Sequence, residues 1–389
     1  MLPAVTERHA TLTVWEEGFD WTPSEPFPYA DLHVPGDGSV SYLARSWESP
    51  VVSSAFAARE LIPSWNARTP AGTWLLVEVR VASGEHASWT PWLTLARWAE
   101  GDREEGAPIT RTTVPGQVLE VGRVATDCYL ATRPHTFDRW QIRVTGLRAP
   151  DAGHGWPELT LVAGAALAFD VRADAPTSRS GLDGAVELDV PSHSQRLHVD
   201  TFPEWDNGGQ SWCSPTSTTM LLEHWRAAPT AAESAWVGHE VDPAVVHGVR
   251  HVYDPAFRGA GNWAFNTAYA ATRGLRAYVT RLRDLTEAER LVAAGIPLIV
   301  SVTFTRDELE GAGYDTNGHL LTIVGFTADG DVISNDPNSH RIASNEQVRT
   351  VFRRDQFERV WLGGDGGLAY VMAPADVPLP EPPDEANWR

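Results

Sequence analysis

The stretch GGQSWCSPTSTTMLLEHW, residues 208–225, places one of only two cysteines directly before a helix-like segment. Pro215 stands in the first turn of that segment, where its missing N–H costs no hydrogen bond. A helix starting just after Cys213 is therefore predicted. A thiol is a useful nucleophile only as the thiolate, and a helix N-terminus together with a nearby imidazolium lowers its pKa. Cys213 has the first of these, so a histidine from elsewhere in the fold must supply the second.

Thirteen histidines compete for this role, and His319 is favoured by its surroundings. The run TNGHLLTIVGF puts it at the first position of an apolar strand, where Gly318 leaves space for a substrate. After a turn at residues 329–330, the returning strand DVISND ends in Asp336, with Asn335 beside it. Asp336 is the candidate to hold the imidazole in the required tautomer.

The register of this hairpin raises a difficulty. A two-residue turn at 329–330 places Asp336 opposite Ile323, which is four residues along the strand from His319. At about 3.3 Å per residue, the offset is roughly 13 Å. A bulge, strong twist or a longer loop must close this gap if Asp336 orients His319.

The order of these residues resembles that of papain-like cysteine peptidases: Cys at a helix start, His opening a strand, then Asp before Pro. The spacing of 17 residues from His319 to Asp336 and the run GHLLTIVGF…ISNDP resemble the bacterial branch related to bacteriocin-processing, double-glycine leader peptidases. The phrases WCSPTST, GNWAFNTAYA and GIPLIVSVTF are similar to an actinobacterial-type subgroup that often carries an N-terminal β-domain. The resemblance covers about residues 185–375.

The resemblance implies a catalytic role for four residues. Cys213 would be the nucleophile, His319 the general base and later acid, and Asp336 the orienting group. A Gln before the Cys would stabilise the oxyanion together with the Cys backbone N–H. Gln195, in VPSHSQ, matches the family's Val-Pro-x-x-x-Gln phrase, but it lies 18 residues before Cys213, so an insertion must loop out. Gln210 lies only three residues before Cys213, and Gln195 is the predicted donor.

The activity implied is hydrolysis of peptide (amide) bonds through a thioester, with no metal or organic cofactor. The expected substrate is a peptide or protein, with cell-wall peptide or glycan also open. Two alternatives remain: a related enzyme such as a cell-wall amidase or a transglutaminase-like acyltransferase, and a non-catalytic binding protein that keeps the peptidase fold. The presence of all three Cys, His and Asp candidates argues against the last.

Composition narrows the class of partner. Acidic residues outnumber basic ones 51 to 31, for a net charge of -20, which argues against nucleic acid or an anionic membrane as the main partner. A neutral or cationic substrate fits better. Cys128 and Cys213 allow at most one disulfide, and Cys128, which lacks candidate partners, is interpreted as structural. The first residues lack a readable secretory signal, and no run reaches about 18 uncharged apolar residues, so a soluble, by default cytoplasmic, protein is expected, with export by another route open.

The length of 389 residues predicts two domains. Residues 1–180 are predicted to form an antiparallel β-sandwich of jelly-roll type, because short alternating segments are separated by Gly, Pro and Asp. In TWLLVEVRV, residues 73–81, Leu75, Val77, Val79 and Val81 would face inward, whereas Glu78 and Arg80 would face outward. Further strands are expected in WLTLARW (92–98), DRWQIRV (138–144) and ELTLVAGAALAF (158–169).

The first half of residues 172–194 is predicted to be a linker, and residues 185–389 an α+β peptidase domain. LTEAERLVAAGIP is expected to be a helix with a Thr286–Glu289 capping box and a stop at Gly295, followed by the strand LIVSVTF. GAGNWAFNTAYAATRGL (259–275) is either a cleft wall or a loop and core helix. The acidic, Gly-rich segment 305–318 is either a lid that favours a cationic substrate or a surface loop.

Several other features have a functional and a structural interpretation. Trp205 and Trp212 flank Cys213 and are possible cleft residues. His247 and His251 have a spacing that suits zinc, but Gly248 stands where a metalloprotease needs Glu, so a solvated loop or helix face is expected. Possible further ligands nearby are His239, Asp242 and Asp254. Tryptophans in the first half suggest carbohydrate docking, although core packing is favoured: Trp47, Trp65, Trp74, Trp89, Trp92, Trp98 and Trp140.

Overall fold

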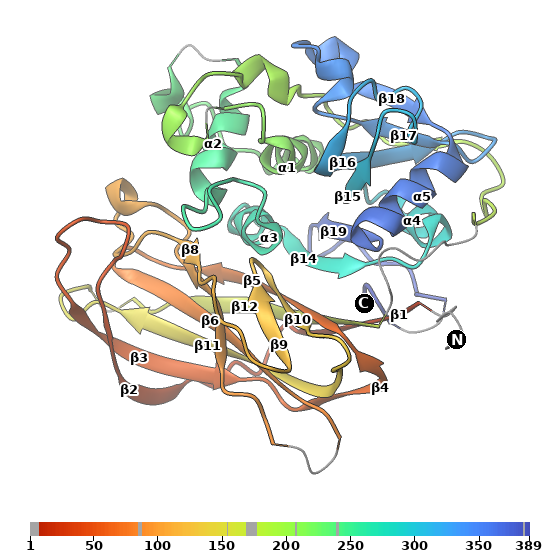
Figure 1. The fold of residues 1–389 in the computed structure, drawn as a ribbon. Helices are drawn as coiled ribbons and strands as arrows, with labels where there is room; N and C mark the ends of the chain where they lie inside the picture. The colour runs from red at the N-terminus through yellow and green to blue at the C-terminus, as the bar shows by residue number, and fades with distance from the viewer. Residues whose placement is uncertain are drawn as a thin grey trace.

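The computed structural model describes residues 8–84, 88–153, 155–168, 177–206, 208–238, 241–383 and 386–389. It consists of an N-terminal β-sandwich and a C-terminal α+β half that stack on each other (Figure 1). The predicted fold class, an antiparallel sandwich followed by an α+β half, is confirmed. The start of the predicted linker, residues 172–176, lies outside the described residues. No helix in the described ranges is long and apolar enough to cross a lipid bilayer.

Two antiparallel sheets face each other in the N-terminal half. The first has the order β1 (His9–Trp15), β12 (Glu158–Ala168), β5 (Glu60–Arg68), β10 (Cys128–Ala131), β9 (Gly122–Ala125). The second has the order β2 (Thr22–Tyr29), β3 (Val40–Glu48), β11 (Phe137–Arg148), β6 (Thr73–Ala82), β7 (Leu93–Trp98), β8 (Thr112–Thr113), and β4 (Val52–Ala58) pairs with β11. Gly164 on β12 leaves room for the ring of Trp140 on β11, because a Cβ there would lie 2.5 Å from a ring atom. This large-against-small fit sets how closely the two sheets pack.

The strands expected around residues 73–81, 92–98, 138–144 and 158–169 are all present. Burial of β6 differs from the prediction, because its second face is buried as well. Trp74 and Leu76 belong to a second, smaller core on that face, and Glu78 pairs with Arg143 at 2.7 Å. A strand covered on both faces shows little alternation of exposure, so the sequence pattern revealed only one of its two packed sides.

The third sheet forms the centre of the C-terminal half. Its order is β14 (Arg276–Arg281), β19 (Leu368–Ala373), β15 (Leu298–Phe304), β16 (Thr316–Phe326), β17 (Val332–Asn335), β18 (Arg349–Phe352), and β13 (Val186–Glu187) pairs with β16. Its helices are α1 (Cys213–His224), α2 (Pro243–Val252), α3 (Trp263–Thr272), α4 (Leu285–Ala293) and α5 (Arg354–Asp365). The first three lie on one side of the sheet and the last two on the other (Figure 1). Short 3-10 turns are η1 (Arg103–Glu105), η2 (Gln195–His198), η3 (Pro203–Trp205), η4 (Ala235–Val237), η5 (Ser339–Arg341) and η6 (Asn345–Gln347).

The helix expected in LTEAERLVAAGIP is present, but its predicted capping box is wrong. Asp284 is the N-cap, and its side chain accepts hydrogen bonds from the backbone N–H groups of Thr286 and Glu287. Glu289 instead pairs with Arg354 of α5 at 2.6 Å. Asp284, two positions before the predicted cap Thr286, reaches two free N–H groups of the first turn, so it caps the helix in place of Thr286.

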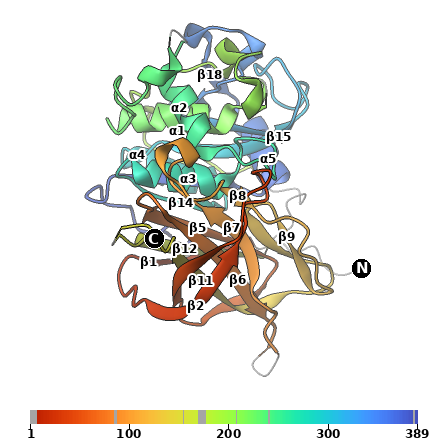
Figure 2. The same cartoon turned by 90° about the vertical axis from the view of Figure 1, so that its left-hand side faces the viewer.

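The two halves share one contiguous core. The rings of Trp65 and Trp98 from the sandwich contact Phe265 of α3, with ring centroids 6.2 and 5.1 Å apart. Asn66 of β5 donates to the carbonyl of Ala277 and accepts from its N–H, at 2.6 and 3.1 Å, so its side chain satisfies the outer edge of β14. Both views show α3 and β14 seated on the sandwich (Figures 1 and 2). The C-terminal half is therefore built directly onto β5.

Candidate active site

Cys213 is the first residue of α1, as predicted. Trp212 before it is fully buried, and its indole N–H donates to the carbonyl of Trp205 at 2.9 Å. This anchored ring fixes where the helix starts. The sulfur therefore lies at the N-terminal end of α1, where the unpaired N–H groups of the first turn favour a negative charge, and the Ser214 N–H is one of its donors.

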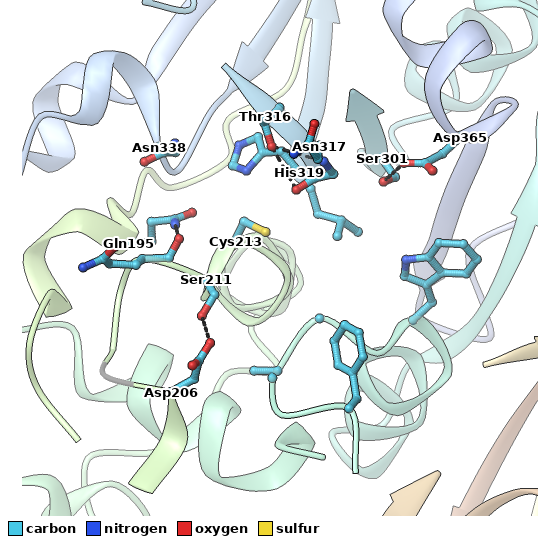
Figure 3. Close-up of a pocket in the computed structure, with 18 of the residues that line it drawn as sticks. Gln195, Asp206, Ser211, Cys213, Ser301, Thr316, Asn317, His319, Asn338 and Asp365 are labelled. Atoms are coloured by element: carbon cyan, nitrogen blue, oxygen red, sulfur yellow. Dashed lines mark hydrogen bonds between the residues drawn. The ribbon is translucent and has the colours of Figure 1, made fainter. Parts of the chain in front are cut away.

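The two glycines of GGQSWC allow a close approach between backbones. A Cβ on Gly208 would lie 1.9 Å from the carbonyl oxygen of His198, and one on Gly209 would lie 1.6 Å from that of Gln195. The chain thus leaves the core after Gln195 and is back against it at Gly208, as the predicted insertion required. Gln195 is thereby placed beside Cys213 despite their separation in sequence (Figure 3).

His319 and Asp336 meet across the β16–β17 hairpin, whose connection spans residues 327–331 instead of two residues. A bulge between Ile323 and Gly325 shifts the register further, so that Thr322 pairs with Asn335. Extending that pairing by one residue places Asp336 opposite Leu321, two residues from His319 instead of four. Diagonal neighbours at about 7–8 Å are within reach of an aromatic side chain. The bulge and the longer connection therefore close the gap that the simple hairpin left open.

The His319 Nε2 atom lies 2.8 Å from Asp336 Oδ1, and both side chains are buried. Two further donors hold the carboxylate: the Tyr314 hydroxyl donates to Oδ2 at 2.8 Å, and the Asn338 backbone N–H donates to Oδ1 at 2.9 Å. Asn335 points elsewhere, because its amide donates to the carbonyls of residues 190 and 191. The carboxylate is thus fixed on three sides, with the imidazole as one of its partners.

Cys213 and His319 shift each other's pKa in opposite directions. Burial raises the pKa of Cys213, but the hydrogen bond and charge of His319, together with the backbone N–H groups of Leu320 and Ser214, lower it below its ordinary value. Burial lowers the pKa of His319, yet the charge and hydrogen bond of Asp336, with the contribution of Cys213, raise it to about 10. These shifts favour a thiolate–imidazolium pair at neutral pH.

Cys213, His319 and both glutamine candidates line one pocket of about 580 Å³. Figure 3 shows Gln195 and Asn338 on one side of Cys213, and Ser301 and Asp365 on the other. The amide nitrogen of Gln195 donates to the carbonyls of Gly209 and Gln210 at 2.8 and 3.2 Å. Gln195 is therefore a buried residue held against the segment before Cys213, whereas Gln210 is exposed.

The segment Gly259–Trp263 forms a wall of this pocket, which agrees with one of the two interpretations of GAGNW. The N-terminal half holds this wall in place. Asp127 accepts a hydrogen bond from the Trp263 N–H at 2.7 Å, and burial raises the pKa of Asp127 to about 7. Fully buried Asp254 accepts from the hydroxyls of Thr112 and Thr113 at 3.1 and 2.7 Å. The sandwich thus fixes the backbone that faces Cys213.

Other candidate residues lie outside the pocket. Trp205 and Trp212 do not line it, so their expected place in the cleft is wrong. His247 and His251 lie on α2 as a stacked, buried pair with ring centroids 4.1 Å apart, and His251 pairs with Glu105 of the sandwich at 3.1 Å. The expected solvated face is therefore wrong, because the sandwich covers it. In the described ranges no group of three or more His, Cys, Asp or Glu has metal-site geometry, and His239 lies outside them.

Cys128 is buried in β10, where its thiol donates to the carbonyl of Ala125 at 3.4 Å and burial raises its pKa well above the ordinary value. Five of the seven tryptophans named above are buried in the sandwich, as core packing predicted: Trp47, Trp65, Trp74, Trp98 and Trp140. The rings of the other two, Trp89 and Trp92, each carry two arginine guanidinium groups within 5.3 Å. These guanidinium groups leave little of either ring exposed for a sugar to stack on.

Sequence reasoning missed Tyr314, because it treated residues 305–318 as a lid or a surface loop. Tyr314 and Leu309 in that segment are buried, so the segment is anchored. A tyrosine five residues before the candidate His, inside an otherwise acidic and Gly-rich run, was the available signal. Asp365 and Ser301 were also missed, since they come from elements far apart in sequence.

Comparisons with known proteins cover both halves. Residues 8–166 match the family described as "Peptidase C39 N-terminal domain", and residues 187–365 match the "Peptidase_C39 like family". A crystal structure from Bacillus anthracis described as a C39-like peptidase matches at 19% identity with a TM-score of 0.30, covering 49% of this chain and 98% of that one. No curated protein matches the chain.

Proposed function

We propose that this chain, which belongs to the C39-like peptidase family, is a cysteine peptidase that hydrolyses peptide bonds through Cys213, His319 and Asp336. The observation that carries the proposal is the convergence of a helix start and a raised-pKa imidazole on one sulfur inside a pocket. A structural cysteine has no need of either. Cys128, buried with a raised pKa, shows the contrasting environment.

In the proposed mechanism, the Cys213 thiolate attacks the carbonyl carbon of the scissile amide, and the carbonyl oxygen becomes an oxyanion. The His319 imidazolium then gives its proton to the leaving amine as the carbon–nitrogen bond breaks, which leaves a thioester. Neutral His319 next takes a proton from water, and the resulting hydroxide attacks the thioester. Collapse of this second tetrahedral intermediate expels the Cys213 thiolate and releases the carboxylic acid, while His319 keeps the proton that it took from water, so the thiolate–imidazolium pair is restored. Asp336 stabilises the imidazolium throughout without changing its own protonation.

Gln195 and the Cys213 backbone N–H are the proposed oxyanion donors. One N–H of the Gln195 amide is tied to Gly209 by the shorter bond of 2.8 Å, which fixes the amide beside the sulfur. The other forms the longer bond of 3.2 Å to Gln210, and this hydrogen is the one that a developing oxyanion would take over. Gln210, which is exposed, lacks such a fixed position.

The test is digestion of a diverse peptide mixture with identification of new termini by mass spectrometry. The unaltered protein is expected to cleave peptides, Cys213→Ala to lose cleavage, and the matched control Cys128→Ala to retain it. Replacement of water by an added amine in the products would favour the acyltransferase alternative. Cleavage that persists in Cys213→Ala, or its absence in the unaltered protein, contradicts the proposal.

A further inference from the structure

One arm of the pocket ends in a carboxylate that no cation neutralises in the part of the chain that the structure describes. Asp365, at the end of α5, is half-buried and lines the pocket. Its Oδ2 atom accepts a hydrogen bond from the hydroxyl of Ser301 on β15. Among the described residues, Asp365 belongs to no ion pair, whereas Asp315 at the same pocket is paired with Arg306 at 2.6 Å. One Asp365 oxygen is therefore fixed by Ser301, and the charge is left for a ligand.

The arm around Asp365 has the lining that a long cationic side chain needs. Leu320 and Trp263 also face the pocket, and they offer apolar surface to the stem of such a side chain. The Trp263 indole packs over the guanidinium of Arg281, with 5.8 Å to the ring centroid. The backbone N–H of Trp263 is held by Asp127, which fixes the main chain that carries the ring. The part of the indole that Arg281 does not cover adds cation–π attraction to the charge of the carboxylate.

Two of the three arginines that line the pocket, Arg196 and Arg341, are not part of this arm. Arg196 follows Gln195 directly, and Arg341 ends the 3-10 turn η5, just after Asn338. Figure 3 places Gln195 and Asn338 on the opposite side of Cys213 from Asp365. These two basic groups and Asp365 therefore lie on opposite sides of the sulfur. The third lining arginine, Arg258, is exposed, and so is Asp206, a lining carboxylate that accepts a hydrogen bond from the Ser211 hydroxyl at 2.7 Å.

We propose that Asp365, Ser301 and Trp263 form a specificity subsite for a lysine or arginine side chain of the substrate, at a position close to the scissile bond. This inference rests on the proposed function, because it assigns a substrate class to the same site. A half-buried carboxylate interacts more strongly with a cation than an exposed one does, since water screens it less. The net charge of -20 also draws cationic peptides toward the protein.

Arginine and citrulline peptides provide the sharpest test, because the two side chains have nearly the same shape and only arginine is charged. Each of the three positions on either side of the scissile bond carries one or the other, and kcat/KM is measured for each pair. At one position the unaltered protein is expected to prefer arginine by at least about tenfold, equivalent to roughly 1.4 kcal/mol. Asp365→Asn should bring that ratio close to one.

Asp355→Asn is the matched control, because it removes the same charge from the same helix at a residue that does not line the pocket. Its arginine preference should equal that of the unaltered protein. A ratio near one at every position in the unaltered protein overturns the proposal, and so does a preference that survives in Asp365→Asn.

A binding experiment separates this proposal from the proposed function. Calorimetry with Cys213→Ala, which retains the pocket without the nucleophile, should show about tenfold tighter binding of the arginine peptide than of the citrulline peptide. Adding Asp365→Asn to that variant should abolish the difference. If no peptide is cleaved but this difference in affinity is present, the peptidase assignment fails and the cation subsite stands. If the arginine and citrulline peptides bind equally well, the subsite proposal fails, whether or not the protein cleaves peptides.

Discussion

Replacing Asp336 with Asn tests the electrostatic basis of the site most directly. The substitution keeps the size of the side chain but removes the negative charge that lies 2.8 Å from the His319 Nε2 atom. The charge and hydrogen bond of Asp336 are the largest influences that raise the pKa of His319, against the opposing effect of burial. Without that charge, the imidazolium loses its main support and the proton returns to the sulfur.

The size of the effect follows from the geometry. An opposite charge within about 4–6 Å shifts a pKa by about 1–3 units, and each unit corresponds to about 1.4 kcal/mol. The thiolate–imidazolium pair of Asp336→Asn should therefore be about 1.4–4 kcal/mol less stable. The thiolate fraction at a pH below the pKa of an ordinary thiol falls by about 10- to 1000-fold, and the two proteins converge at alkaline pH, where the thiol ionises without help.

The assay is the rate of iodoacetamide alkylation of Cys213 between about pH 5 and 9, followed by peptide mass spectrometry. In the unaltered protein the imidazolium persists below its raised pKa of about 10, so alkylation should be rapid and nearly independent of pH down to about pH 5. In Asp336→Asn it should rise steeply with pH. Cys128, with its raised pKa, is an internal control that should label slowly in both. Identical pH profiles for Cys213 in the two folded proteins would refute the reasoning.

Three further predictions concern the residues that hold the site. Tyr314→Phe removes a hydrogen bond to a buried carboxylate and should lower the free energy of unfolding by about 1.5–3 kcal/mol in urea denaturation; an unchanged value would show that this bond contributes nothing. Asp127 has a folded pKa of about 7, above its ordinary 3.8, so the folded state binds the extra proton and stability should fall as pH rises between those values, by up to about 4 kcal/mol. Asp127→Asn should lose this fall and be the more stable protein at pH 8 by thermal melting, and a variant no more stable there than the unaltered protein contradicts the assignment. Gly209→Ala forces a Cβ to within 1.6 Å of the Gln195 carbonyl oxygen, so it should displace the segment before Cys213 and slow its alkylation at pH 6, whereas unaltered labelling would show that the backbones can separate freely.

The candidate nucleophile and its histidine could be predicted from local sequence patterns. Pro215 in the first turn of a helix and His319 at the start of an apolar strand are features of short stretches, and short-range backbone preferences determine both. The strands of the sandwich were predictable for the same reason. Their second faces were not, because burial of Trp74 and Glu78 depends on segments distant in sequence.

The sequence predicted Asp336 as the partner of His319, but it did not predict the hairpin geometry that brings the two side chains together. A bulge between Ile323 and Gly325 and the connection at residues 327–331 set the register, and neither has a clear signature in the sequence. Tyr314 was missed because an acidic, Gly-rich segment gives no sign that one of its side chains is buried beneath a carboxylate.

The sequence by itself determined the order of elements, the antiparallel sandwich before an α+β half, and the residues that supply sulfur, imidazole and carboxylate. Only the tertiary structure decided that the sandwich holds the pocket wall through Asp127 and Asp254, and that Asp365 lines the same pocket with no ion-pair partner among the described residues. The physical reason is the separation along the chain between the residues that determine each feature. Local patterns encode which face of an element is apolar, whereas a hydrogen bond between residues more than 130 positions apart exists only after the chain has packed.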